Sequence, residues 1–172
     1  MQSPPALVLS GPPGVGKTTV GWRVFDRCID LGMAPAFADL DLLGAAWPAP
    51  EGDPYQARLK AKNLAAVWAN CRDAGSLRLI VAGVVERASE RLLLEEATGG
   101  AVLICRLDAP DGELARRIRG RGRESGADLS RLVARAAELS AQLVADDVSD
   151  FSVGTGGRST DEVAARVLTR WP

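Results

Sequence analysis

The sequence of 172 residues contains no histidine and only three cysteines, Cys28, Cys71 and Cys105. Without histidine, any general base must be a carboxylate or another group. Three widely spaced cysteines with no histidine near them argue against both a disulfide framework and a zinc site. We expect three reduced thiols in the core of a cytoplasmic protein.

An excess of charge of one sign and long apolar runs are also lacking. The 21 basic and 22 acidic side chains give a net charge of −1, so no overall positive field would attract nucleic acid. Charge interrupts every apolar stretch before it reaches the length of a membrane span. The first residues include no basic segment of the kind that opens a secretory leader. We therefore expect no nucleic-acid partner and no membrane partner.

Short apolar runs alternate with segments of helical periodicity along the sequence. Such runs are typical of parallel strands that are buried on both faces of a sheet. The expected strands cover residues 6–10, 35–39, 77–81, 101–107 and 151–153, and the expected helices cover residues 17–31, 54–73, 85–97, 111–119, 128–145 and 160–170. The alternation predicts one α/β domain over residues 1–172, with a five-stranded parallel sheet between two helix layers.

Residues 11–18, GPPGVGKT, match the phosphate-binding pattern G-x-x-x-x-G-K-[ST] in full. Glycines let the backbone curl so that successive N–H groups point at phosphate oxygens, and the following helix presents its positive end to the anion. We expect Lys17 to reach the β- and γ-phosphates of ATP or GTP and Thr18 to bind Mg²⁺. The expected nucleotide contacts are Gly11, Gly14, Val15, Gly16, Lys17, Thr18 and Thr19. The alternative is a glycine-rich turn that binds nothing.

Two acids, Asp39 and Asp41, follow the second expected strand at the sheet edge where ligands bind. Because they are two residues apart, they point to the same side if the strand continues. One carboxylate could hold a water of the Mg²⁺ shell while the other takes a proton from an acceptor hydroxyl. The alternative is that one of them only caps a turn.

The third expected strand lacks the closing aspartate of GTPases and most motor ATPases. Its end reads LRLIVAGVVER, with Gly83 and Glu86 after the apolar run. We expect Gly83 to allow a substrate to approach closely. Glu86 is either a substrate contact or a solvated acid at a helix start. The missing acid disfavours hydrolysis by water.

Arginines are concentrated between residues 116 and 135, with Gly120, Gly122 and Gly126 among them as candidate hinges. Arginine neutralises the charge that spreads over a transferring phosphoryl group, so we expect a mobile arginine lid over residues 116–131, with Arg117 and Arg121 on the nucleotide. The seven arginines are Arg116, Arg117, Arg119, Arg121, Arg123, Arg131 and Arg135. The alternatives are a solvated basic helix and an RNA-binding patch, although no aromatic residue interleaves with the run.

Together these motifs resemble the small P-loop kinases of the nucleoside-monophosphate-kinase-like group, which includes shikimate, gluconate and adenylylsulfate kinases and chloramphenicol phosphotransferase. The resemblance covers almost the whole chain and implies the three-layer P-loop NTPase fold. It implies that Asp41 is the base and Asp39 lies near the metal, although the reverse order stays open. It also implies that the last loop, with Gly156 and Arg158, contacts the nucleotide base.

The resemblance implies that the acceptor pocket of this chain is formed by residues 42–70 and by the end of the third expected strand. The candidate acceptor contacts are Asp41, Trp47, Tyr55, Arg58, Lys62, Asn63 and Glu86. No pair of arginines is placed there to clamp a monophosphate, so a neutral or cyclic compound with a hydroxyl group fits better. By analogy, the acceptor is an antibiotic of the chloramphenicol or capuramycin type.

Two other functions remain open from the sequence. A nucleoside monophosphate kinase would differ only in its acceptor, and a regulatory ATPase would act through a protein partner. The arginine-rich segment and the two acids favour a kinase that acts on a small-molecule hydroxyl, as a monomer or homodimer.

Overall fold

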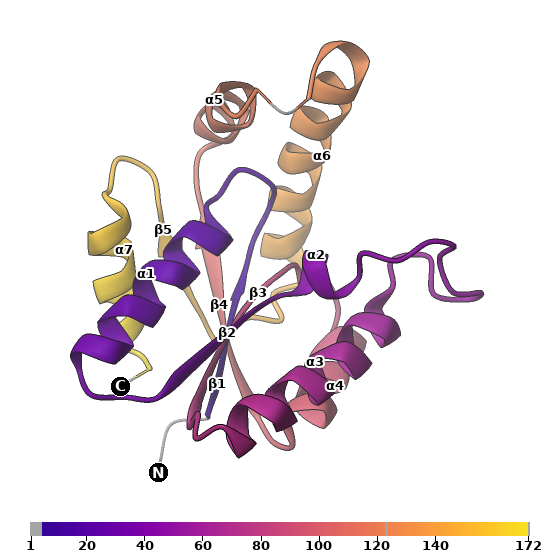
Figure 1. The fold of residues 1–172 in the computed structure, drawn as a ribbon. Coiled ribbons are helices and arrows are strands. Elements are labelled where there is room, and N and C mark those ends of the chain that lie inside the picture. Colours follow the sequence, from indigo (N-terminus) through magenta and orange to yellow (C-terminus); the bar gives the residue numbers. More distant parts are fainter. Residues whose placement is uncertain (1–4, 123, 172) are drawn as a thin grey trace.

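The structure is a computed structural model that describes residues 5–122 and 124–171. Five parallel strands form a sheet in the order β2-β3-β1-β4-β5 (Figure 1). The strands are β1 (Ala6–Ser10), β2 (Pro35–Asp39), β3 (Arg78–Ala82), β4 (Val102–Asp108) and β5 (Phe151–Gly154). The expected α/β class and five-stranded parallel sheet are confirmed.

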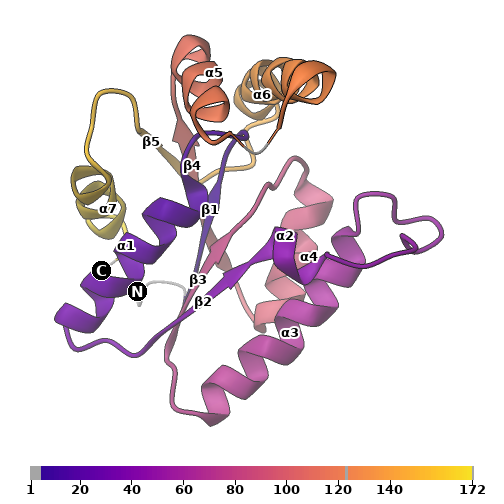
Figure 2. The ribbon, with the colours of Figure 1, turned by 45° about the horizontal axis from the view of Figure 1, so that its top comes forward.

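Helices cover both faces of this sheet and rise above its carboxyl edge. The helices are α1 (Lys17–Asp30), α2 (Leu40–Leu43), α3 (Ala57–Asp73), α4 (Ala88–Thr98), α5 (Asp111–Gly120), α6 (Gly126–Ala145) and α7 (Thr160–Leu168). Helices α1 and α7 pack together on one face, and α3 and α4 pack together on the other (Figure 2). Helices α5 and α6 stand side by side above the strand ends, next to the loop between β1 and α1.

The core is divided by the sheet into two apolar layers, because successive side chains of a strand point to opposite faces. Leu7 and Leu9 of β1 face α1 and α7, where Trp171 is fully buried. Val8 of β1 faces α3 and α4, where Trp68 is buried. The strands are therefore fixed on both sides, which holds their carboxyl ends in place as a rigid edge for a site.

The structure corrects the expected elements in several places. Helix α2, which was not expected, begins at Leu40 directly after β2, and helix α4 begins at Ala88, not at residue 85. Helix α3 begins at Ala57, not at residue 54, because the Asp53 carboxylate accepts hydrogen bonds from the backbone N–H groups of Ala57, Arg58 and Leu59 at 2.8–3.2 Å. Side-chain capping of this kind sets where a helix starts, and apolar periodicity alone does not reveal it.

The three cysteines are free: Cys28 and Cys105 are buried and Cys71 is partly buried. Burial raises the pKa of the Cys105 thiol to about 12, so this thiol stays protonated at neutral pH.

Within residues 5–122 and 124–171, none of the helices is both long and apolar enough to cross a membrane.

Candidate active site

The loop between β1 and α1 has the glycine-dependent backbone that the pattern predicts. Gly14 and Gly16 adopt φ values of 85° and 102°, which side-chain-bearing residues rarely adopt. A Cβ atom at Gly14 would also lie 2.9 Å from the Ile118 side chain and 3.1 Å from the Leu114 carbonyl oxygen. The glycines thus allow both the curl of the loop and its close contact with α5.

Lys17 at the start of α1 is folded over this loop. Its Nζ donates hydrogen bonds to the carbonyl oxygens of Gly11 at 2.8 Å and Pro12 at 3.2 Å. Burial is the main cause that lowers the pKa of Lys17 to about 8; the nearby Arg121 acts in the same direction, and Asp41 and Asp39 oppose the shift. An ammonium group that has lost much of its water interacts strongly with a phosphate brought next to it.

Asp39 lies beside Thr18, as the metal prediction requires. The Thr18 hydroxyl donates to Asp39 Oδ2 at 2.9 Å, and the backbone N–H of Asp41 donates to Asp39 Oδ1 at 3.0 Å. Asp39 therefore caps α2 as well as facing Thr18. The strand ends at Asp39, as expected, so the condition under which Asp39 and Asp41 would share a strand face is not met.

Mg²⁺ binds oxygen ligands and keeps several waters, and a hydroxyl beside a carboxylate fits this preference. In the described part of the chain, no group of three or more Cys, Asp or Glu side chains is placed to hold a metal ion by itself. Thr18 and Asp39 therefore suit a Mg²⁺ ion that arrives with a polyphosphate and takes its other ligands from phosphate and water.

A cavity of about 300 Å³, here called the nucleotide cavity, borders the phosphate loop on the α5 and α7 side. It is lined by Gly14, Val15, Gly16, Thr19, Val20, Arg117, Arg121, Thr155, Arg158, Thr160 and Val163. It brings together segments of the phosphate loop, the arginine-rich segment and the last loop, which are far apart in the sequence. Gly156 lies just outside it, in a neighbouring open cavity that Arg158 also lines.

Arg117 links the walls of the nucleotide cavity. It donates to the carbonyl oxygen of Val15 at 3.2 Å, and to the hydroxyl and carbonyl oxygens of Thr155 at 2.9 Å and 3.1 Å. It also pairs with Glu113 on its own helix. The guanidinium group thus connects α5, the phosphate loop and the loop that follows β5.

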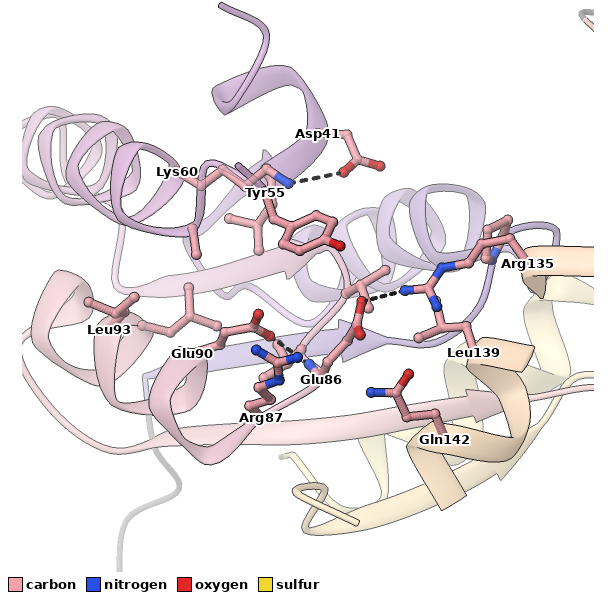
Figure 3. Close-up of a pocket in the computed structure, with 16 residues that line it drawn as sticks. Asp41, Tyr55, Lys60, Glu86, Arg87, Glu90, Leu93, Arg135, Leu139 and Gln142 are labelled. Atoms are coloured by element: carbon pink, nitrogen blue, oxygen red, sulfur yellow. Dashed lines mark hydrogen bonds and ion pairs between the residues drawn. The ribbon is translucent and has the colours of Figure 1, made fainter. Parts of the chain in front are cut away.

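A larger cavity of about 450 Å³, here called the acceptor cavity, opens between the phosphate loop, α2, α3, α4 and α6 (Figure 3). It is lined by Pro13, Leu40, Asp41, Tyr55, Ala57, Lys60, Val84, Val85, Glu86, Arg87, Glu90, Leu93, Leu94, Arg135, Leu139 and Gln142. Pro13 connects this cavity to the phosphate loop, and Asp41 lies at its rim with Lys60 Nζ 3.7 Å from its Oδ1 atom.

Several sequence-predicted acceptor contacts do not line the acceptor cavity. Trp47 is 93% exposed on the loop before α3, and the exposed Arg58 and Lys62 lie on α3 away from the cavity. The Asn63 side chain donates to the Leu43 carbonyl oxygen at 2.7 Å and joins α3 to α2. Asp41, Tyr55 and Glu86 are the predicted residues that the structure brings together there.

Gly83 has a different role from the one expected. A Cβ atom at Gly83 would lie 2.5 Å from Leu40 Cδ1, so the space beside this glycine is filled by Leu40 and not by a substrate. Lys60, Glu90 and Gln142 also line the cavity although no motif indicated them, and Arg135, expected only as part of the basic run, lines it too. Lys60 had a signal that could have been used, because it is one of three lysines in an arginine-rich chain.

The seven clustered arginines are not gathered at one site. Arg117 and Arg121 line the nucleotide cavity, and Arg135 lines the acceptor cavity. Arg131, at the end of the expected lid, is exposed and pairs with Asp128 on its own helix. Arg123 lies outside the described residues.

No protein-family profile and no curated protein match this sequence. Solved structures do match. The tunicamycin resistance protein of Deinococcus radiodurans is 22% identical with a TM-score of 0.69, over 96% of this chain and 94% of that one. A gluconokinase of Sinorhizobium meliloti is 21% identical with a TM-score of 0.65, over 98% and 92%. Shikimate kinase of Acinetobacter baumannii, solved with shikimate, is 19% identical with a TM-score of 0.61, over 96% and 92%. The chain therefore has the fold of the small P-loop kinases, as its motifs predicted.

Proposed function

We propose that this protein transfers the γ-phosphoryl group of ATP or GTP to a hydroxyl group of a small molecule. The observation that supports this most directly is that two cavities border the same phosphate loop. Residues 14–16 line the nucleotide cavity, and Pro13 lines the acceptor cavity. Transfer between two bound molecules needs two such adjoining spaces, whereas hydrolysis needs room only for water.

The nucleotide binds with its polyphosphate on the loop, where backbone N–H groups and Lys17 hold the phosphate oxygens. Thr18 and Asp39 would hold the accompanying Mg²⁺, which would supply positive charge to neutralise the phosphates. In this proposal Arg117 and Arg121, which line the nucleotide cavity, contact the nucleotide and the transferring group. Arg158, which lines the same cavity, and Gly156, which lines the neighbouring one, contact the base.

Asp41 is the group that receives the acceptor's proton in this proposal. Its side chain is 74% exposed at the rim of the acceptor cavity, so a bound hydroxyl can reach it. The hydroxyl oxygen forms a bond to the γ-phosphorus, the bond from that phosphorus to the β,γ-bridging oxygen breaks, and the hydroxyl proton passes to Asp41. The products are the phosphorylated compound, the nucleoside diphosphate and one proton.

The acceptor in this proposal is a neutral compound, with antibiotics as the first class to test. A structural neighbour is named as a tunicamycin resistance protein, and a volume of about 450 Å³ is in the range of cavities that hold drug-sized molecules. A nucleoside monophosphate fits less well, because the three basic side chains that line the cavity are matched by three acidic ones.

The test is acceptor-dependent release of nucleoside diphosphate by the purified protein with Mg²⁺ and ATP or GTP. The panel contains tunicamycin, a capuramycin, chloramphenicol, an aminoglycoside, shikimate, gluconate and nucleoside monophosphates, and Lys17→Ala provides the blank. We expect one neutral compound to accelerate release and to gain the mass of one phosphate. A nucleoside monophosphate that alone does so would replace the proposed acceptor class. Slow release that only a protein partner stimulates would favour a regulatory ATPase.

A further inference from the structure

The acceptor cavity holds charged side chains whose charges cancel. Asp41, Glu86 and Glu90 line it together with Lys60, Arg87 and Arg135. Arg135 Nη2 lies 3.0 Å from Glu86 Oε1, and Lys60 Nζ lies 3.7 Å from Asp41 Oδ1 (Figure 3). Two of the three cations in the cavity are thus already paired with acids of the same cavity.

The Glu86–Arg135 pair joins two walls of this cavity. Arg135 projects from α6, and Glu86 belongs to the segment between β3 and α4. That segment is well anchored: the backbone N–H of Val85 donates to the buried Ser10 hydroxyl at 3.0 Å, and the backbone N–H of Glu86 donates to Glu90 Oε2 at 2.6 Å. Glu86 is therefore held where its charge offsets that of Arg135.

A ligand with a carboxylate or phosphate group would have to compete with Glu86 for Arg135 and would lie close to the Glu86 charge. Like charges brought together in a partly desolvated site oppose binding strongly. An uncharged compound meets no such barrier, and its apolar part can contact Leu93, Leu94 and Leu139. The pairing thus discriminates between acceptors by charge.

We propose that Glu86 is a specificity-determining residue that excludes anionic acceptors by pairing with Arg135. Without the negative charge of Glu86, Arg135 becomes a free cation in the cavity, and the cavity accepts anions. The inference rests on the proposed function in one respect, because it takes this cavity to be the acceptor site. It goes further by naming the residue that sets the charge of the acceptor.

The experiment measures equilibrium binding of gluconate and shikimate by calorimetry to protein saturated with ADP and Mg²⁺, so that the phosphate loop is occupied. We expect Glu86→Gln to bind at least one of these anions about tenfold or more tightly than the wild-type protein does. Glu86→Gln combined with Arg135→Gln should lose the gain. Glu138→Gln, an exposed acid on α6 outside the cavity, makes the same change in net charge and should bind anions as the wild type does.

A second variant keeps the test decisive if Glu86→Gln does not fold. Arg135→Gln leaves Glu86 without its cation, so the cavity becomes acidic and should bind choline, a cationic hydroxyl compound, more tightly than the wild type does. The inference is overturned if the folded variants bind these probes no more tightly than the wild type, or if the wild type already binds gluconate or shikimate as tightly as Glu86→Gln does.

Binding and transfer separate this inference from the proposed function. If the variants change binding as expected but no acceptor is ever phosphorylated, the cavity is charge-selective and the kinase proposal fails alone. If a neutral acceptor is phosphorylated but the variants do not alter anion or choline binding, the kinase proposal stands and Glu86 does not set specificity.

Discussion

The nucleotide cavity and the acceptor cavity border the same loop, but their cations are held in different ways. Near the nucleotide cavity, Lys17 and Arg158 donate to backbone carbonyl oxygens. Arg117 pairs with Glu113 but also donates to two backbone carbonyl oxygens, and no acidic side chain is among the described residues that line this cavity. In the acceptor cavity, Lys60 and Arg135 lie against carboxylates.

A carbonyl oxygen accepts hydrogen bonds from a cation without neutralising its charge. A carboxylate accepts the hydrogen bonds and also neutralises the charge. The nucleotide cavity therefore keeps a positive field for a polyphosphate, and the acceptor cavity is close to neutral. The difference explains how one loop can serve two ligands of unlike charge.

The largest effect is expected from Lys17→Ala on the nucleotide side. Loss of a cation that contacts the transferring phosphoryl group should lower kcat by about 10³-fold or more. Steady-state release of nucleoside diphosphate, with the acceptor found in the panel, measures this. Lys62→Ala, which removes an exposed lysine of α3 that lines neither cavity, is the matched control and should retain wild-type activity.

The next effect concerns the two acids where β2 ends and α2 begins, Asp39 and Asp41. Asp41→Asn should lower kcat by about 10²- to 10³-fold while leaving the affinity for ADP and Mg²⁺ unchanged, since a general base acts on the acceptor and not on the nucleotide. Asp39→Asn should instead raise the Mg²⁺ concentration needed for half-maximal rate, because Asp39 contacts Thr18. If the two variants exchange these effects, Asp39 is the base and Asp41 the group near the metal.

A smaller effect is expected for Arg117, which connects the walls of the nucleotide cavity. Arg117→Ala removes the hydrogen bonds to Val15 and Thr155 and should weaken ADP binding about tenfold. Binding of a ligand in the acceptor cavity should change little. Calorimetry with ADP and with the acceptor, each titrated alone, measures both. Equal losses for the two ligands would show that the cavities are not independent.

The same contrast explains how much the sequence could predict. The phosphate loop lies within eight consecutive residues, and its geometry follows from glycines and a helix start, so pattern reasoning was sufficient to identify it. Three of the five strands, β1, β3 and β4, were found because buried parallel strands are continuous apolar runs. Helix α2 was missed because the Asp39 carboxylate accepts from the Asp41 backbone, a local hydrogen bond that competes with an extended strand.

The acceptor cavity was harder to predict because its walls come from several segments that only the tertiary fold brings together. One feature was nevertheless available from the sequence. Ala61, Leu64 and Trp68 form a buried stripe at helical spacing on α3, and Lys60 borders this stripe, whereas Lys62 points away from it. A comparison of the helix faces that the two lysines occupy would have favoured Lys60 as the one that lines the cavity. The pairing of Glu86 with Arg135 joins residues 49 positions apart and has no local signal.

The smallest effect concerns the wall behind the nucleotide cavity, where Asp161 of α7 accepts hydrogen bonds from Arg23 and Arg27 of α1. The hydrogen bonds from Arg27 and Arg23 hold the pKa of the Asp161 carboxyl below its usual value. The stabilisation is therefore present at neutral pH and is lost as the pH falls through this lowered pKa. Because Asp161, Arg23 and Arg27 are each about a third to a half exposed, Asp161→Asn should lower the melting temperature by only about 1–3 °C at pH 7. The difference should shrink progressively as the pH falls below the ordinary carboxyl pKa of 3.8, and the exposed Asp26→Asn on α1 should show none. A loss that persists in acid would mean that Asp161 acts through packing and not through its charge.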